Sequence, residues 1–229
     1  MVEREAGGRG MGQQRVVAVD VGSVRTGSFA WAALDVPSAG SALAGYGSDP
    51  ASAVAAAAEA LADGRRAVLA LEAPMAVPVP QAWVELGRGR AGEGNRPWSA
   101  SAGAGALGTG LAQGAWMLGE LGRAVPGLTA TTQVRRWTGG AARLLLVEAF
   151  VSGAGKPVAT VLGQHAADAE AAARMVADRL GGEDGTDVEC APHRAFNLLA
   201  AQALWAGLDI PGDELRRDVL VVRARPVRT

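Results

Sequence analysis

Four acidic residues and one histidine stand in positions from which they could bind a cation. Asp20 ends the apolar run "RVVAVD", Glu72 ends "RAVLALE", and Glu148 lies near the end of "ARLLLVEAF". Asp168 follows His165 by three residues in the alanine-rich segment "HAADAEAAARMV". Carboxylates that gather at one point raise each other's pKa unless a cation neutralises them. Mg²⁺ or Mn²⁺ suits such oxygen ligands, and two of these ions about 4 Å apart can clamp the reacting oxygens of a phosphoryl displacement.

Most of these residues also have a purely structural interpretation. Asp20 stands beside a glycine-containing turn, where Asp is common, and Glu148 is as well explained inside a strand as in a site. Asp168 could be an acid that stabilises the first turn of a helix, and His165 an ordinary residue of the same helix start. Glu72 is harder to explain at the surface, because it closes an apolar run. The metal hypothesis therefore depends on whether the residues converge.

The surrounding sequence predicts an α/β fold whose elements end at these residues. Buried or half-buried strands are expected over 15–20, 28–35 and 41–47, and their short connections favour an antiparallel meander. The later elements expected, in chain order, are a helix between the N-cap Asp49 and the stop residue Gly64, a strand over 67–72, a helix over 104–124, a strand over 142–150, a helix from 165 that ends at Gly181, a helix over 193–207 and a strand over 218–224. A strand, helix and strand in succession are typical of a parallel crossover.

This order of elements would bring the acids to one place. If the strands that end at Asp20, Glu72 and Glu148 are adjacent and parallel, the acids meet at one carboxyl edge of the sheet, where α/β proteins bind ligands. The helix that follows brings Asp168 to the same edge. His165 shares its helix side, since residues three apart are neighbours on a helix, and could ligate a metal or move a proton.

Residues 75–103 are expected to form a long loop with a functional role, because such loops are uncommon in compact domains. Arginine suits phosphate or carboxylate groups and tryptophan stacks on bases. The residues expected to bind substrate are Arg88, Arg90, Asn95, Arg96 and Trp98 of this loop, together with Arg25 of the turn after Asp20. The alternative is a solvated loop without a ligand.

Composition and charge narrow the classes of function. Hydrophobic residues make up 49% of the 229 residues and charged residues 20%, as in folded globular proteins. A net charge of −1 argues against non-specific coating of nucleic acid, which needs a basic surface. No apolar stretch reaches the roughly 18 residues of a membrane span. Residues 1–14 are expected to be a disordered lead without a signal peptide, and Cys190 is the single cysteine, so a cytoplasmic location is expected.

The motifs that carry these acids resemble those of known families. The element order is similar to the ribonuclease H-like fold, and "VDVGSVRTG" resembles the first-strand motif of bacterial resolvase-like nucleases of that superfamily. "HAADAEAAARMV" is similar to the last catalytic helix of crossover-junction resolvases. The endings "LEAP" and "VEAF", with the long insertion, resemble the uncharacterised family called domain of unknown function 429. The resemblance covers about residues 15–180 and implies that Asp20, Glu72 and Asp168 bind metal, with His165 or Glu148 auxiliary.

Together these observations favour a metal-dependent phosphodiester hydrolase of the nuclease type. Asp20, Glu72 and Asp168 would hold Mg²⁺ or Mn²⁺ on a ribonuclease H-like domain over 15–180, and the partner would be a nucleic acid or nucleotide. The alternative is a non-hydrolytic module on the same fold that binds a nucleotide, an anion or a protein. Residues 181–229 are expected to form a helix and strand packed on the domain, where a second copy could pair to give a homodimer.

Overall fold

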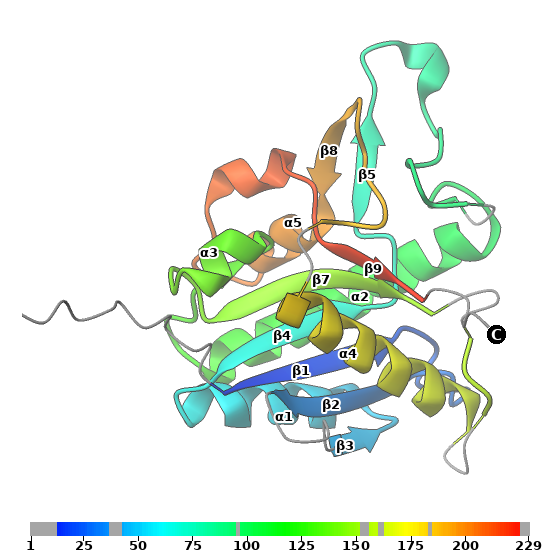
Figure 1. Cartoon of the computed structure of the whole chain (residues 1–229). Coiled ribbons are helices and arrows are strands. Elements are labelled where there is room, and N and C mark those ends of the chain that lie inside the picture. Colours follow the sequence, from blue (N-terminus) through cyan, green and yellow to red (C-terminus); the bar gives the residue numbers. More distant parts are fainter. Residues whose placement is uncertain are drawn as a thin grey trace, which may run out of the picture.

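The computed structural model describes residues 13–36, 43–94, 97–151, 156–159, 163–182 and 185–224 (Figure 1). They form an α/β fold around a mixed seven-stranded sheet, so the predicted fold class is confirmed at this level. Helices lie on both faces of the sheet, and a smaller two-stranded sheet projects beside it. None of the helices in the described ranges is long and apolar enough to cross a membrane.

The first three strands form the antiparallel half of the sheet. The strand β1 (Gln14–Asp20) pairs antiparallel with β2 (Ala30–Val36), and β2 pairs antiparallel with β3 (Leu43–Gly47). Residues 14–19 of β1 are all buried, which agrees with the nearly continuous apolar sequence of this strand. The predicted meander is therefore present, and β1 occupies an inner position of the sheet.

The later strands add a parallel half. The strand β4 (Arg66–Leu71) lies parallel to β1, and β7 (Leu144–Phe150) lies parallel to β4. The short strand β6 (Ala130–Thr131) pairs with the beginning of β7, and β9 (Val221–Arg223) pairs with its end. Because β1, β4 and β7 run in the same direction, their carboxyl ends lie at the same edge of the sheet.

Two layers of helices cover the sheet (Figure 1). On one face, α1 (Pro50–Ala62), α2 (Ser101–Ala124) and α5 (Leu198–Trp205) contribute to a core that includes Leu69 and Leu71 of β4. On the opposite face, α3 (Val134–Thr138) and α4 (Gln164–Gly182) contribute to a core that includes Val68 and Ala70. The alternation along β4 follows from the period of two residues in a strand.

Local sequence explains where α1 begins and how closely α4 packs. The side chain of Asp49 caps α1 by accepting a hydrogen bond from the Ser52 amide at 2.8 Å. In α4, the small buried residue Ala169 packs against Ala30 and Ala32 of β2. A helix whose inner face carries alanine can lie close to the sheet, which brings the first turns of α4 near the end of β1.

The region over 75–103 differs from the expected loop. It contains the strand β5 (Ala76–Val79) and a short 3₁₀ helix, η1 (Trp83–Glu85), and α2 already begins at Ser101. The strand β5 pairs antiparallel with β8 (Arg194–Asn197). Residues 194–197 are therefore a strand and not the start of the helix expected over 193–207. The pairing joins residues more than a hundred positions apart, which no local pattern could predict.

The last segment of the chain is built into this fold. After α5, the 3₁₀ helix η3 (Gly212–Arg216) precedes β9. The Glu214 carboxylate of η3 is fully buried and accepts hydrogen bonds from the hydroxyl groups of Thr131 and Thr132. Residues 185–224 thus contribute to both the large sheet and its core.

Candidate functional site

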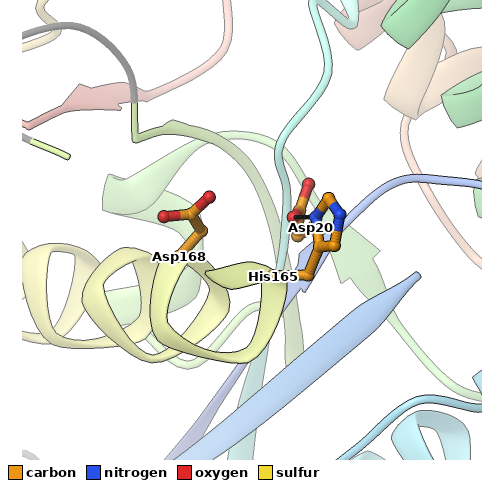
Figure 2. Close-up of side chains that lie close together, drawn as sticks. All are labelled: Asp20, His165 and Asp168. Carbon is orange, nitrogen blue, oxygen red and sulfur yellow. Dashed lines mark hydrogen bonds and ion pairs between the residues drawn. The ribbon is translucent and has the colours of Figure 1, made fainter. Parts of the chain in front are cut away.

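Asp20, His165 and Asp168 form a group that could hold a metal ion (Figure 2). One ligand atom from each residue lies within 4.8 Å of the others, and this group is the one of its kind within the described ranges. Asp20 is the last residue of β1, and the other two come from the first turns of α4. The distance between His165 Nδ1 and Asp20 Oδ2 is 2.6 Å. The structure therefore brings together three of the residues that the sequence assigns to the site.

The secondary structure determines how these side chains meet. The helix α4 packs across β1 and β2 with its alanine side, so its amino-terminal turns lie above the end of β1. His165 and Asp168 are three residues apart and share one side of the helix, as the spacing predicts. Asp168 is buried, whereas the His165 side chain is 47% exposed. The imidazole thus forms the solvent side of the group and Asp168 its inner side.

Glu72 lies beside this group at the end of β4. Its backbone amide donates a hydrogen bond to the Val19 carbonyl at 2.9 Å, which continues the pairing of β4 with β1. Its Oε1 accepts a hydrogen bond from the Val151 amide at 3.1 Å, while Oε2 is buried and without a hydrogen-bond partner among the described residues. Burial, together with the charges of Asp20 and Asp168, raises the pKa of Glu72 to about 8. Glu72 is outside the group of three, but the negative charges of Asp20 and Asp168 contribute to its raised pKa.

The electrostatics indicate a site that is short of positive charge. Burial also raises the pKa of Asp20, and the contact with His165 only partly opposes this rise. An unpaired carboxylate oxygen in the protein interior is costly. A cation bound among Asp20, Asp168 and Glu72 would remove this cost, so these carboxylates could hold a metal ion.

Two further side chains contact the group and were missed by the sequence analysis. The Lys156 ammonium lies 2.8 Å from Asp168 Oδ2, and the Gln164 amide donates a hydrogen bond to Asp168 Oδ1 at 2.7 Å. Gln164 stands four residues before Asp168, so helical spacing could have identified it. Lys156 is the only lysine of the chain, but its position beside Asp168 depends on the path of the connection between β7 and α4.

Glu148 does not belong to this group, although the sequence analysis included it. It is paired in register with Leu71, whose side chain packs in the core on the α1 and α2 face of the sheet. Glu148 is fully buried and accepts hydrogen bonds from the amides of Met75 and Ala76, each at 2.7 Å. The sequence predicted that Glu148 lies near the carboxyl edge, which is correct. It could not predict which face the side chain occupies.

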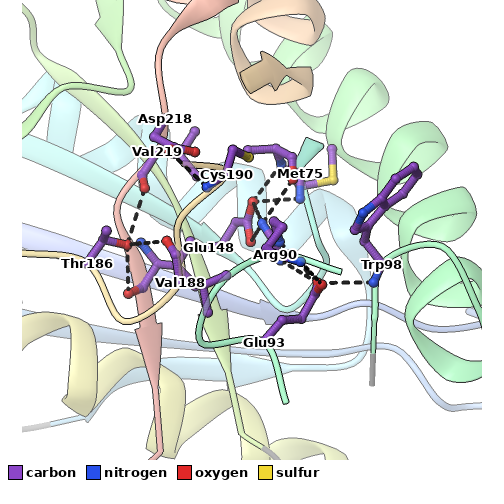
Figure 3. Close-up of polar contacts among 12 residues, drawn as sticks. Met75, Arg90, Glu93, Trp98, Glu148, Thr186, Val188, Cys190, Asp218 and Val219 are labelled. Carbon is purple, nitrogen blue, oxygen red and sulfur yellow. Dashed lines mark hydrogen bonds and ion pairs between the residues drawn. The ribbon is translucent and has the colours of Figure 1, made fainter. Parts of the chain in front are cut away.

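Arg90 is also corrected, from a substrate-binding residue to a partner of Glu148 (Figure 3). Its Nη1 lies 2.9 and 2.8 Å from the two carboxylate oxygens of Glu148, and it also donates to the Ala76 carbonyl at 3.0 Å. Only 1% of the Arg90 side chain is exposed. Glu93, which is also buried, accepts hydrogen bonds from the Arg90 amide and Nε. These contacts hold the segment after β5 against the sheet.

The other expected substrate-binding residues have varied positions. Arg88 is exposed and forms an ion pair with Glu85 at 2.8 Å. Trp98 is half-buried, and its indole Nε1 donates a hydrogen bond to the Arg88 carbonyl at 2.9 Å. Arg25 is exposed in the turn that follows Asp20, close to the carboxyl edge. Asn95 and Arg96 lie outside the described residues.

Comparisons with known proteins assign no family to the chain, so its function is inferred from the geometry of the site. No family model matches the chain, and neither the curated proteins nor the solved structures give a significant match. Fold and site together define an α/β protein with a mixed sheet and an Asp, His, Asp group at the sheet edge that could hold a metal ion.

Proposed function

We propose that the chain is a divalent-metal-dependent phosphodiester hydrolase of the nuclease type. The observation that carries the proposal is the convergence of Asp20, His165 and Asp168 within 4.8 Å, next to the buried and unpartnered Oε2 of Glu72. Mg²⁺ or Mn²⁺ is the proposed metal, because carboxylate oxygens dominate the ligand set. Asp20, Asp168 and Glu72 are the proposed ligands.

We also propose a ribonuclease H-like fold for the domain. The strand order β3-β2-β1-β4-β7, with β2 antiparallel and β4 and β7 parallel to β1, supports this proposal. The position of α4, which follows the last of these strands and carries two residues of the group, supports it as well. The resemblance of "VDVGSVRTG" and "HAADAEAAARMV" to resolvase-like nucleases concerns the same elements.

The residues of the site have distinct tasks in the proposed reaction. A bound metal would neutralise the carboxylates and polarise a phosphate oxygen. Asp20 binds His165 through Nδ1 and thereby leaves Nε2 of the exposed imidazole for a proton transfer with water or with the leaving oxygen. Lys156 adds a positive charge beside Asp168 and can attract the phosphate. Arg25 and Arg88, which are both exposed, are the proposed contacts for further phosphate groups.

Metal binding and hydrolysis can be measured with matched variants. We expect Mn²⁺ to raise the melting temperature of the wild-type protein and to support hydrolysis of bis(p-nitrophenyl) phosphate. Asp20→Asn should weaken Mn²⁺ binding by at least about tenfold, because it removes a charged ligand from the group. Asp178→Asn is the control, since Asp178 is exposed on the same helix and lies outside the group. A wild-type protein without Mn²⁺ binding, or equal affinities of the two variants, would contradict the proposal.

One contact favours a second candidate, a non-hydrolytic module that binds an anion. The Lys156 ammonium already neutralises Asp168 and could take the place of a metal. In that case Mn²⁺ would leave the melting temperature unchanged, whereas binding of inorganic phosphate would be lost in Lys156→Gln. Phosphate binding that requires Mn²⁺ would exclude this candidate.

A further inference from the structure

Beside the candidate metal site lies a small hollow with mostly apolar walls. Its volume is about 160 Å³, and both Asp20 and Glu72 line it. The walls come from Val21, Pro74, Ala106, Phe150 and Val188. Asp20 therefore belongs both to the candidate metal group and to the lining of this hollow, and Glu72 lines the hollow beside it. We propose that the hollow receives one unpaired nucleobase of a nucleotide phosphodiester whose phosphate lies at the metal site, an inference that rests on the proposed function.

The shape of the walls suits a flat ring. Phe150 of β7 and Arg223 of β9 are partners in register, so their side chains lie side by side on one face of the sheet. Both line the hollow, and so do Ala102 and Ala106 of α2. Aromatic side chains bind bases of any sequence by stacking, and the arginine guanidinium offers a second planar surface. The lining thus combines an aromatic ring, a guanidinium group and small alanine side chains, which suit a flat ring system.

The polar groups of the hollow match a base better than a phosphate. Glu93 lines the hollow and is held in place by the Arg90 amide at 2.9 Å and the Trp98 amide at 3.0 Å. Glu93 Oε1 also accepts a hydrogen bond from Arg90 Nε, whereas Oε2 has a second lone pair that can accept one from a ring N–H or an exocyclic amine. Arg223 Nη1 donates to the Gly92 carbonyl, and a guanidinium carries five N–H donors in all, so Arg223 has donors for a ring nitrogen or carbonyl.

Size and charge limit the substrate further. A hollow of about 160 Å³ is smaller than the roughly 300–1,000 Å³ of sites for drug-sized ligands, so it holds one ring system and not a base pair. The net charge of −1 gives the chain little general attraction for duplex nucleic acid. The substrate class is therefore a nucleotide ester with an unpaired base, either a small dinucleotide or a single-stranded end.

The inference is tested by filling the hollow from α2. Ala106→Phe places a ring in the hollow, and Ala104→Phe is the matched control, because Ala104 is exposed on the same helix and does not line it. With Mn²⁺ present, we expect Ala106→Phe to weaken binding of adenosine 5′-monophosphate by about tenfold or more, the scale of one lost base stack. Binding of Mn²⁺ and of inorganic phosphate should stay unchanged. Ala102→Phe, at an exposed position that lines the same hollow, repeats the test if Ala106→Phe fails to fold.

These measurements distinguish a failure of the proposed base site from a failure of the proposed metal-dependent hydrolase. Equal affinity of the Ala106→Phe and Ala104→Phe proteins for adenosine 5′-monophosphate would overturn the base site, as would equal affinity of the wild type for this nucleotide and for ribose 5-phosphate. A wild-type protein that binds no Mn²⁺ contradicts the proposed hydrolase instead. If that protein still binds the nucleotide, and loses it in Ala106→Phe, the base site stands. Faster cleavage of a duplex than of a dinucleotide or a single strand would also overturn the inference.

Discussion

At the scale of single residues, burial and the charges of neighbouring acids oppose the ionisation of Glu72. Its Oε1 has a backbone partner, but Oε2 is buried without one among the described residues, and Asp20 and Asp168 add negative charge nearby. Because of this environment the pKa of Glu72 is raised to about 8, so near neutral pH the carboxyl retains its proton when no cation is present. Asp20 has a partner in His165 and Asp168 has one in Lys156. Glu72 is thus the acid that most needs a cation.

The raised pKa of Glu72 predicts that the free energy of unfolding depends on pH when a chelator keeps the protein free of metal. The pKa of Glu72 is about 8 in the folded protein and about 4.5 in an unfolded chain. The unfolded chain therefore loses its proton first, and stability falls as the pH rises from about 4.5 to about 8. Glu72→Gln carries no such proton, so at pH 8 to 9 we expect it to be more stable than the wild type by about 1–3 kcal/mol, with little difference near pH 4.5. Urea denaturation in EDTA across this range measures the effect.

The same stability measurements with saturating Mn²⁺ in place of EDTA test whether Glu72 is a ligand. The metal should stabilise the wild type and reverse the order of the two proteins, because the glutamine side chain of the Glu72→Gln variant carries no charge. A Glu72→Gln protein that is less stable than the wild type at pH 8 in EDTA would contradict the prediction. Equal stabilisation of both proteins by Mn²⁺ would remove Glu72 from the proposed ligands.

At the scale of elements, the buried ion pair of Arg90 and Glu148 connects β7 to the residues on both sides of β5. Glu148 extends from β7 to the amides of Met75 and Ala76, and Arg90 connects it to the segment that follows β5. Met75 and Ala76 come directly after Pro74, which lines the hollow together with Glu72. The pair therefore positions the wall of the site without touching the metal group.

Removal of this pair should be costly. Arg90→Ala leaves Glu148 buried beside the sheet without its cation, and a broken buried pair typically costs about 3–5 kcal/mol. Arg88→Ala is the control, because Arg88 is exposed and an exposed ion pair contributes about 0–1 kcal/mol. Urea denaturation of both variants at neutral pH measures the difference. Similar losses in the two variants would show that the pair contributes little.

At the scale of the whole molecule, residues 185–224 contribute a strand to the main sheet and side chains to its core. The strand β9 pairs with the end of β7, and Arg223 and Phe150 become neighbours through this pairing. Glu214 and Asn197, which belong to this segment, both form hydrogen bonds with the hydroxyl group of Thr132. The hollow beside the candidate metal site therefore needs residues from both ends of the described sequence.

This arrangement predicts that the segment unfolds together with the sheet. Amide hydrogens over 219–222, which are buried, should exchange with deuterium about as slowly as those over 144–149 of β7. Mass spectrometry of peptic fragments after timed exchange measures the rates. Exchange over 219–222 that is faster by orders of magnitude, with β7 still protected, would mean that the segment opens separately.

Much of the fold and part of the site followed from the sequence because their signals are local. The apolar run before Asp20, the cap at Asp49 and the alanine-rich helix around Asp168 each lie within a short window of sequence. Such windows determine strands, helix starts and the spacing of His165 and Asp168. The direction of the parallel strands then predicts that Asp20 and Asp168 meet at one edge, which agrees with the structure.

The rest was decided by tertiary structure, because it depends on residues far apart in the chain. The pairing of β5 with β8 replaced the expected loop and the start of the expected helix. The register of β7 with β4 turned Glu148 to the opposite face, where Arg90 neutralises it. Tertiary structure also placed Lys156 beside Asp168. By itself the sequence determined which acids stand at the ends of elements. Only packing decided which of them form the group that could hold a metal ion and which are buried in the core, because burial and strand register join distant segments.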